Sequence, residues 1–154
     1  MAHVVASVFL VTTDGPAGKA GFTATSVTSV SHAPPSLLVC ANQSGHSLSI
    51  IERNGCFALS LLAVQDQYLA NRFAGRDGIE GDARFDGACW SSGETGSPIL
   101  ASAATVFDCE LAQATAYGSH MILVGNAVDL WAKEGKEALL YGQRQFGQFH
   151  GDLS

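Results

Sequence analysis

The sequence predicts a mainly β protein, built as a barrel or sandwich of many short strands. Segments rich in β-branched residues recur along the chain, Gly-rich turns separate them, and strand candidates outnumber helix candidates by about three to one. Helices do not alternate with strands, which argues against a doubly wound parallel sheet and its Rossmann dinucleotide site. The 154 residues contain no internal repeat and no linker long enough to divide them. We therefore expect one folded domain over residues 1–154.

The first third of the chain contains three strand candidates. Residues 4–13 are rich in Val and Thr and end at an Asp-Gly-Pro turn, which favours a hairpin into residues 21–31. In that second segment apolar and hydroxyl side chains alternate, with a change of phase at Ser26 that a β-bulge would explain. Two prolines then interrupt the chain before residues 36–41, a continuous apolar run typical of a buried strand.

Two helices and further strands follow. The spacing in residues 47–54 predicts a short helix with Ser47 as its N-cap and Gly55 as its stop. A second helix is expected over residues 65–73, followed by a Gly- and Asp-rich loop over residues 74–86. The remaining strand candidates are residues 56–62, 103–114, 120–131 and 139–141, with a continuation over residues 144–149.

Composition and charge narrow the functional classes. With 8 Lys and Arg against 14 Asp and Glu, the net charge of −6 argues against a nucleic acid or an anionic membrane as the main partner. No apolar run approaches the roughly 20 residues needed to span a bilayer, and we expect a cytoplasmic protein. The four cysteines form no Cys-x-x-Cys pair and are expected to be free thiols. The histidine spacing predicts no metal site.

Two polar clusters are candidates for ligand binding. Six of the nine residues from Thr23 to Ser31 are Ser or Thr, and their hydroxyl and backbone N–H groups could hold an anion. Residues 42–47 (NQSGHS) lead into the N-terminus of the first expected helix, where free N–H groups favour a negative charge. If the flanking strands are antiparallel neighbours, the clusters meet. An exposed Ser/Thr face and an ordinary polar loop remain the alternatives.

His120, at a Gly118-Ser119-His120 turn that enters a strand, is the third candidate. A histidine beside a cleft can contact a planar ligand or a carboxamide, although a structural histidine gives the same pattern. The sequence contains neither the Gly-x-Ser-x-Gly motif of serine hydrolases nor the P-loop of nucleotide-binding enzymes. It therefore offers no motif for hydrolysis or for phosphate transfer from a nucleotide.

In several blocks the sequence resembles the flavin reductase-like family, the small reductase components of two-component monooxygenases. The blocks are TTDGPAGKAGFTATSVTSVSHAPPSLLVCAN, RFAG at residues 72–75, the Gly-x-His turn at residues 118–120, and LLYGQRQF at residues 139–146. The resemblance covers nearly the whole chain in order. It implies an FMN-binding split β-barrel of Greek-key type, a homodimer with flavin near the subunit interface, NADH or NADPH as the hydride donor, and a partner monooxygenase.

The resemblance also implies a set of cofactor-binding residues. By this resemblance, residues 23–27 line the ribityl chain and isoalloxazine, largely through backbone groups. Around the ribityl chain and the phosphate it places Thr25, Ser29, Asn42, Ser44 and Ser47. Backbone N–H groups near Val27 or Cys40 are expected to support negative charge on the ring. The complete set is Thr23, Ala24, Thr25, Ser26, Val27, Ser29, Cys40, Ala41, Asn42, Ser44, Ser47, Arg72, Phe73, Ala74, Tyr141, Arg144 and Phe146. His120 matches the residue that meets the nicotinamide and is the catalytic candidate.

One departure from the family concerns Ser119, where many members carry Asp, although the hydroxyphenylacetate and pyrimidine branches carry Thr.

The favoured function is reduction of FMN by NAD(P)H for a partner monooxygenase. One alternative is a flavoenzyme that reduces a specific substrate such as a corrinoid, as in the family's cob(II)yrinic acid a,c-diamide reductases. Others are a non-catalytic flavin- or haem-binding barrel and an interaction module without a cofactor.

Overall fold

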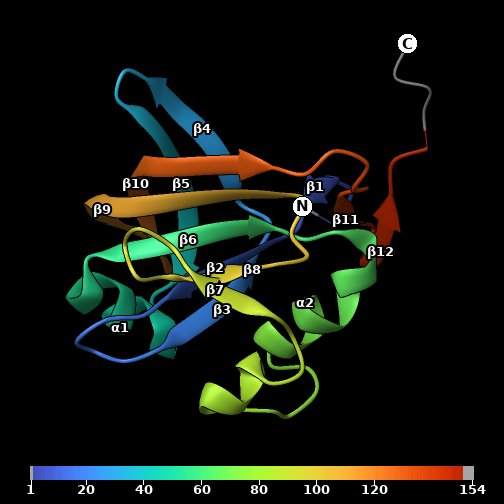
Figure 1. Ribbon diagram of the computed structural model, residues 1–154, viewed down its shortest axis with the longest axis horizontal. Helices are drawn as coiled ribbons and strands as arrows, with labels where there is room; N and C mark the ends of the chain where they lie inside the picture. The colour runs from blue at the N-terminus through green and yellow to red at the C-terminus, as the bar shows by residue number, and fades with distance from the viewer. Residues whose placement is uncertain (1, 151–154) are drawn as a thin grey trace.

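The computed structural model of the protein describes residues 2–150 and confirms a mostly β fold (Figure 1). A seven-stranded antiparallel sheet has the order β3-β2-β6-β9-β10-β5-β4. Its strands are β2 (Phe9–Thr13), β3 (Ala20–Ala24), β4 (Val27–His32), β5 (Pro35–Asn42), β6 (Cys56–Leu61), β9 (Thr105–Tyr117) and β10 (His120–Ala132). The smaller sheets contain β1 (Ala6–Ser7), β11 (Leu139–Gly142) and β12 (Gln145–Gln148), and β7 (Trp90–Ser92) with β8 (Pro98–Leu100).

The two edges of the large sheet meet at a seam. Strands β3 and β4 are the outermost strands of that sheet, yet only Thr25 and Ser26 separate them in the chain. The sheet must therefore curl until its edges lie together at these two residues. Among residues 2–150, no ladder pairs β3 with β4. The result is a barrel that stays split along one side, as the family resemblance implies.

The expected segment over residues 21–31 is consequently two strands. The change of phase at Ser26 is the place where the chain passes from one sheet edge to the other, and a bulge within one strand was the wrong interpretation. Residues 4–13 are also divided: β1 pairs with β11, whereas β2 pairs with β3 and β6. Val8, between β1 and β2, donates its N–H to the Leu139 carbonyl at 3.0 Å.

Two α-helices cover parts of the barrel. Helix α1 (His46–Asn54) ends as predicted at Gly55, which has φ +71° and donates its N–H to Ile51. Its N-cap, however, is Gly45. The prediction of Ser47 as N-cap was wrong because the Ser47 hydroxyl lies inside the first turn and donates to the Gly21 carbonyl at 2.9 Å.

Helix α2 (Gln67–Phe73) follows a 3-10 turn, η1 (Val64–Asp66), and agrees with the second predicted helix. The expected loop over residues 74–86 contains a further 3-10 turn, η2 (Gly81–Phe85). The β7–β8 hairpin was not predicted, because strands of three residues are too short to show periodicity. None of the helices in residues 2–150 is long and apolar enough to cross a membrane.

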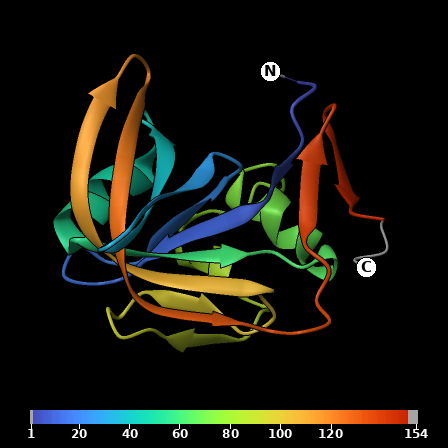
Figure 2. The same ribbon diagram turned by 90° about the horizontal axis from the view of Figure 1, so that it is seen from above.

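The core lies in two layers. Inside the barrel, the largest buried side chains include Val11, Val39, Phe57, Leu59 and Leu123. A second cluster fills the space between the sheet, α2 and η2. Figure 2 shows the β9–β10 hairpin extending from one side of the molecule, while the β11–β12 hairpin stands on the opposite side near the N-terminus. The site described below lies where the sheet edges, α1 and α2 converge.

Candidate functional site

The seam between β3 and β4 opens into a cavity of about 420 Å³. This volume lies within the range of about 300–1,000 Å³ typical of small-molecule sites. The walls come from β3, β5, the starts of α1 and β10, and the end of α2. Eleven of the residues expected from the sequence line it: Thr23, Ala24, Thr25, Ser26, Cys40, Ala41, Asn42, Ser47, Phe73, Ala74 and His120.

Beside the seam, Ser26 is held to Cys40 of β5 only by long hydrogen bonds, one of them from the Ser26 hydroxyl to the Cys40 carbonyl at 3.3 Å. The Cys40 N–H lies 3.4 Å from the Ser26 carbonyl oxygen and 3.3 Å from the Ser26 hydroxyl oxygen, so one donor is shared between two distant acceptors. Strands β4 and β5 pair further along, from Val27 with Val39. The backbone around Thr25 and Ser26 is therefore only weakly engaged by the protein and faces a cavity, which suits it to bind a polar ligand edge.

One end of the cavity suits an anion. Helix α1 has no side-chain cap at Gly45 and no acidic residue in its first turn, so its first backbone N–H groups are not satisfied by a side chain. Gly45, Ser47 and Leu48 all line the cavity. Free N–H groups at a helix start, aided by the helix dipole, bind phosphate well.

Two polar side chains beside that end have donor groups that bond to no protein atom within residues 2–150. The Asn42 side-chain oxygen accepts hydrogen bonds from the N–H and the hydroxyl of Ser44, at 3.0 and 2.9 Å, which leaves the Asn42 amide NH₂ free. Across residues 2–150 the Thr25 hydroxyl also takes part in no protein hydrogen bond. Both residues are exposed and line the cavity. They can therefore donate to a ligand without losing an internal contact.

His120 stands beside the C-terminal end of β5, directly paired with Asn42 in the β5–β10 ladder. The Ser119 hydroxyl lies 2.8 Å from its Nδ1, which leaves Nε2 for a ligand. Gly118 has φ +57°, a conformation that glycine adopts without strain, and this sharp turn places His120 at the first position of β10. The ladder thus explains why two residues 78 positions apart share one site.

A second cavity of about 180 Å³ adjoins the first and shares Thr23, Thr25 and Ala74 with it. Two predicted residues, Tyr141 and Phe146, line it with their rings 5.1 Å apart. The guanidinium of Arg76 lies over both rings, at 5.8 and 6.0 Å from their centroids. A cation held on aromatic rings beside the main cavity can support negative charge on a bound ligand.

Five of the expected residues line neither cavity: Val27, Ser29, Ser44, Arg72 and Arg144. Ser44 still supports the site by bonding to Asn42. Ser29 lines a separate cavity on the far part of β4 and β5.

Arg72 is engaged in its own loop. It forms an ion pair of 3.1 Å with Asp77 and donates a 2.8 Å hydrogen bond to the Asp86 carbonyl. The pKa of Asp77 is lowered, chiefly by the hydrogen bond from the Ile79 N–H and further by Arg72. Arg72 therefore fixes the segment that carries Ala74 and Arg76 beside the cavities.

Some lining residues were missed in the sequence. Phe22, Gly45 and Leu48 complete the first cavity, whereas Val8, Ala70 and Arg76 complete the second. Arg76 directly follows the RFAG block, and its position two residues after Ala74 was the available signal. The apolar residues carried no signal beyond ordinary core packing.

Gly21 has a structural role next to the site. A Cβ atom placed there would lie 2.7 Å from the Val11 carbonyl oxygen and 2.9 Å from the Phe73 ring. Only glycine therefore allows Phe73, from α2, to pack closely against β3 and form the cavity wall.

The arrangement fits an elongated ligand with an anionic end, a polar middle and a flat apolar part. The α1 start and the Asn42 amide suit the anion, the Thr25 hydroxyl suits the polar middle, and Ala24, Ala41 and Phe73 provide apolar contact. FMN has this distribution of groups, so the residues present fit a flavin mononucleotide.

Comparisons with known proteins agree with this geometry. Residues 1–150 match the model of the flavin reductase like domain family. The FMN reductase (NADH) RutF of Stutzerimonas stutzeri is 40% identical over 146 residues, which cover 95% of this chain and 83% of that protein. The RutF 2 protein of Methylorubrum extorquens is 42% identical, with 95% and 84% covered.

Among solved structures, BorF, the flavin reductase component of a bacterial two-component tryptophan halogenase, superimposes with a TM-score of 0.88 at 32% identity. The alignment covers 96% of this chain and 92% of BorF. The family model matches nearly the full length, and the identity to the relatives exceeds one third. The chain therefore belongs to the flavin reductase-like family.

Proposed function

We propose that this protein is an NADH-dependent FMN reductase. The observation that carries the proposal is the seam cavity, which combines an uncapped helix start, free polar donors and an apolar wall with His120 at its edge. Relatives at about 40% identity are named FMN reductases that use NADH. When bound, the flavin supplies the redox chemistry, acceptance of a hydride from a nicotinamide, and the protein supplies binding, orientation and electrostatics.

The phosphate of FMN would be held by the backbone N–H groups at the start of α1 and by the Asn42 amide. No carboxylate lies in that first turn to repel it. Thr25 would donate its hydroxyl to the ribityl chain. Because the Asn42 amide and the Thr25 hydroxyl donate to no protein group within residues 2–150, binding gains their hydrogen bonds without breaking others.

The ring would lie against the apolar wall of Ala24, Ala41, Leu48 and Phe73. The weakly engaged backbone at Thr25 and Ser26 faces the same space and can bond to its polar edge. Arg76, held over Tyr141 and Phe146, adds positive potential next to this region. A preorganised donor or cation is worth more in such a partly enclosed site than in open water.

His120 would orient the nicotinamide. Its Nδ1 is engaged by Ser119, so Nε2 can bond to the carboxamide and hold the two rings within reaction distance of about 3–3.5 Å. No nucleophile or general base is needed in the protein for a direct hydride transfer. The role of His120 is therefore binding geometry.

We further propose a homodimer that passes reduced flavin to a partner oxygenase in the cytoplasm. BorF is one component of a two-component system. Exposed apolar side chains on the β4 and β10 part of the barrel, Val30 at 50% and Leu130 at 57% exposure, support burial against a second copy. The four free cysteines suit a reducing compartment.

The proposal is tested by adding NADH anaerobically to the protein with FMN and following the visible flavin band. Rapid bleaching that saturates with NADH is expected. His120→Ala should raise the KM for NADH more than the Kd for FMN. A flavin band that binds but persists would leave a flavin-binding protein and contradict reduction, and an unchanged NADH profile in His120→Ala would remove His120 from the site.

A further inference from the structure

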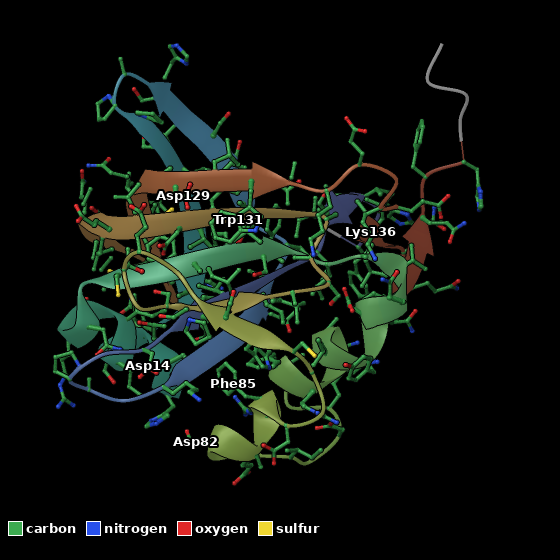
Figure 3. All side chains as sticks on the ribbon, viewed as in Figure 1. Asp14, Asp82, Phe85, Asp129, Trp131 and Lys136 are labelled. Carbon is green, nitrogen blue, oxygen red and sulfur yellow. The ribbon has the colours of Figure 1, made fainter. Side chains whose placement is uncertain are left out.

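The wall between the end of α2 and the β11–β12 hairpin carries one charged side chain, that of Arg76. Of the Lys, Arg, Asp and Glu residues that the structure describes, only Arg76 lines either the seam cavity or the second cavity beside it. The acidic side chains labelled in Figure 3, Asp14, Asp82 and Asp129, stand on other parts of the chain and line neither cavity. Although the whole chain has a net charge of −6, the charge in this lining is positive.

The guanidinium of Arg76 is held by residues from α2, β11 and β12. Gly75 has φ +73°, and the left-handed turn there brings the Arg76 N–H to the Asn71 carbonyl at 2.9 Å. The Arg76 Nη1 donates a further hydrogen bond of 3.3 Å to the Asn71 side-chain oxygen. Tyr141 and Phe146 are paired across the β11–β12 ladder and present their rings to the guanidinium. The cation is thus fixed beside the cavities although its side chain is exposed.

No carboxylate in the described part of the chain neutralises this guanidinium. The ion pair between Arg72 and Asp77 is the only one within residues 2–150. Asn71, Tyr141 and Phe146, which contact Arg76, carry no charge at neutral pH. A cation without a counter-ion attracts negative charge on a ligand in the neighbouring cavity. Water weakens that attraction at an exposed side chain, and a group fixed at the cavity wall retains part of it.

We propose that Arg76 favours binding of the reduced flavin over the oxidised flavin and so raises the reduction potential of the bound cofactor. The inference rests on the proposed function, because a flavin must occupy the seam cavity. Acceptance of a hydride adds two electrons and one proton, so the reduced ring carries one more negative charge than the oxidised ring. A fixed cation stabilises that additional charge. The FMN phosphate has the same charge in both forms, so attraction of the phosphate to Arg76 would leave the potential unchanged.

The experiment measures the reduction potential of bound FMN without using NADH. Each protein, in excess over FMN in mildly alkaline buffer, is reduced slowly by xanthine and xanthine oxidase beside a reference dye. Fluorescence titration gives the Kd of oxidised FMN, and the potential then gives the Kd of reduced FMN. For Arg76→Gln we expect the Kd of reduced FMN to rise about five-fold more than that of oxidised FMN. This ratio corresponds to a fall of about 20 mV in a two-electron potential.

Three comparisons identify the charge of Arg76 as the cause. Arg53→Gln is the matched control, because Arg53 is exposed in the last turn of α1 and lines neither cavity, and it should leave the potential unchanged. Arg76→Lys keeps the charge and loses the planar group, so its potential should lie closer to the wild type than that of Arg76→Gln. Riboflavin, which has no phosphate, should show the same fall in potential in Arg76→Gln.

Equal rises of the two Kd values in Arg76→Gln, with an unchanged potential, would overturn the inference and assign Arg76 to the phosphate. Unchanged Kd values for both forms would overturn it as well. If the wild type failed to bind FMN, or bound FMN that the dye system reduced and NADH did not, the result would instead contradict the proposed function.

Discussion

The side-chain amide of Gln43 donates a hydrogen bond of 3.0 Å to the backbone carbonyl of His120. The same NH₂ group donates to the Gly118 carbonyl, also at 3.0 Å, and the Gln43 N–H donates to the Ser119 carbonyl. Three hydrogen bonds therefore tie the loop that carries Asn42 to the turn that carries His120. Gln43 lines neither cavity of the site, yet it joins the residues proposed for the flavin phosphate to the residue proposed for the nicotinamide.

Gln43→Glu should impair the use of NADH through His120. The glutamate carboxylate cannot donate and would face two carbonyl oxygens, so the turn should move. We expect the KM for NADH to rise about five-fold or more, with a smaller change in the Kd for FMN. If Gln43 acts through His120, the double variant Gln43→Glu/His120→Ala should have nearly the same KM for NADH as His120→Ala alone. Additive effects in the double variant would show that Gln43 acts separately, and Gln113→Glu on the exposed hairpin is the control.

Thr25→Ala and Asn42→Ala should each weaken FMN binding by about two- to ten-fold, the value of one hydrogen bond to a ligand. Both side chains have free donors that face the cavity, so little stability should be lost. Fluorescence titration with FMN measures the effect. Thr28→Ala removes a similar exposed hydroxyl from β4 outside both cavities and should leave the Kd unchanged. An unchanged Kd in both site variants would remove this end of the cavity from the flavin site.

The four thiols should differ in reactivity, and one should report on the ligand. Cys89 is exposed, Cys40 is half-buried in the cavity lining, and Cys56 and Cys109 are buried. Burial, aided by the neighbouring Asp108, raises the pKa of Cys109 to about 12, so its thiol stays protonated and unreactive at neutral pH. Alkylation followed by mass spectrometry should label Cys89 and Cys40 in the free protein, and FMN should slow only Cys40. Equal labelling of Cys40 with and without FMN would place the flavin elsewhere.

Arg144→Gly should stabilise the protein without weakening FMN binding. The two-residue turn between β11 and β12 has φ +50° at Gln143 and +64° at Arg144, which costs free energy in residues other than glycine. Relief of that strain, offset by the flexibility of glycine, should raise the free energy of unfolding by about 0.5 kcal/mol. Thermal and urea unfolding measure it. If Arg144→Gly weakened FMN binding, the prediction would be wrong, and Arg144 would have the cofactor-binding role that the family resemblance implies.

Leu130→Asp should convert the proposed homodimer to a monomer. Leu130 is 57% exposed and, with Val128, borders a cavity of about 410 Å³ between β4, β5, β9 and β10. A buried, unpaired carboxylate there would cost several kcal/mol. Light scattering during gel filtration gives the mass of each species. Phe149→Asp, at a residue with 62% exposure near the C-terminus, should leave the mass unchanged. A monomeric wild type would contradict the proposed dimer.

Local patterns in the sequence were sufficient for most of the secondary structure. Alternation and β-branched content identified the long strands, and the left-handed Gly55 ended α1 where predicted. The hydroxyl run and the NQSGHS loop were expected to meet if their strands were neighbours, and the structure brings Thr25 and Asn42 to one cavity. The strands and the end of α1 depend on residues close in the chain, whose conformations are set by local sterics and hydrogen bonding. The meeting of Thr25 and Asn42 was predicted only on the condition that their strands are neighbours, which the tertiary structure decides.

Other features required the tertiary structure. The sequence showed a change of phase at Ser26, but only the curling of the sheet makes that point the seam between its two edges. Arg76 meets Tyr141 and Phe146 across 65 or more positions, and Gln43 meets His120 across 77. Ser47 had the signature of a helix cap, yet its hydroxyl donates to Gly21 on a neighbouring strand. The sequence by itself determined most of the strands, the end of α1 and the family, because these follow from local patterns. The closure of the barrel decided which side chains face one cavity, because contacts between distant segments form only when the whole sheet packs.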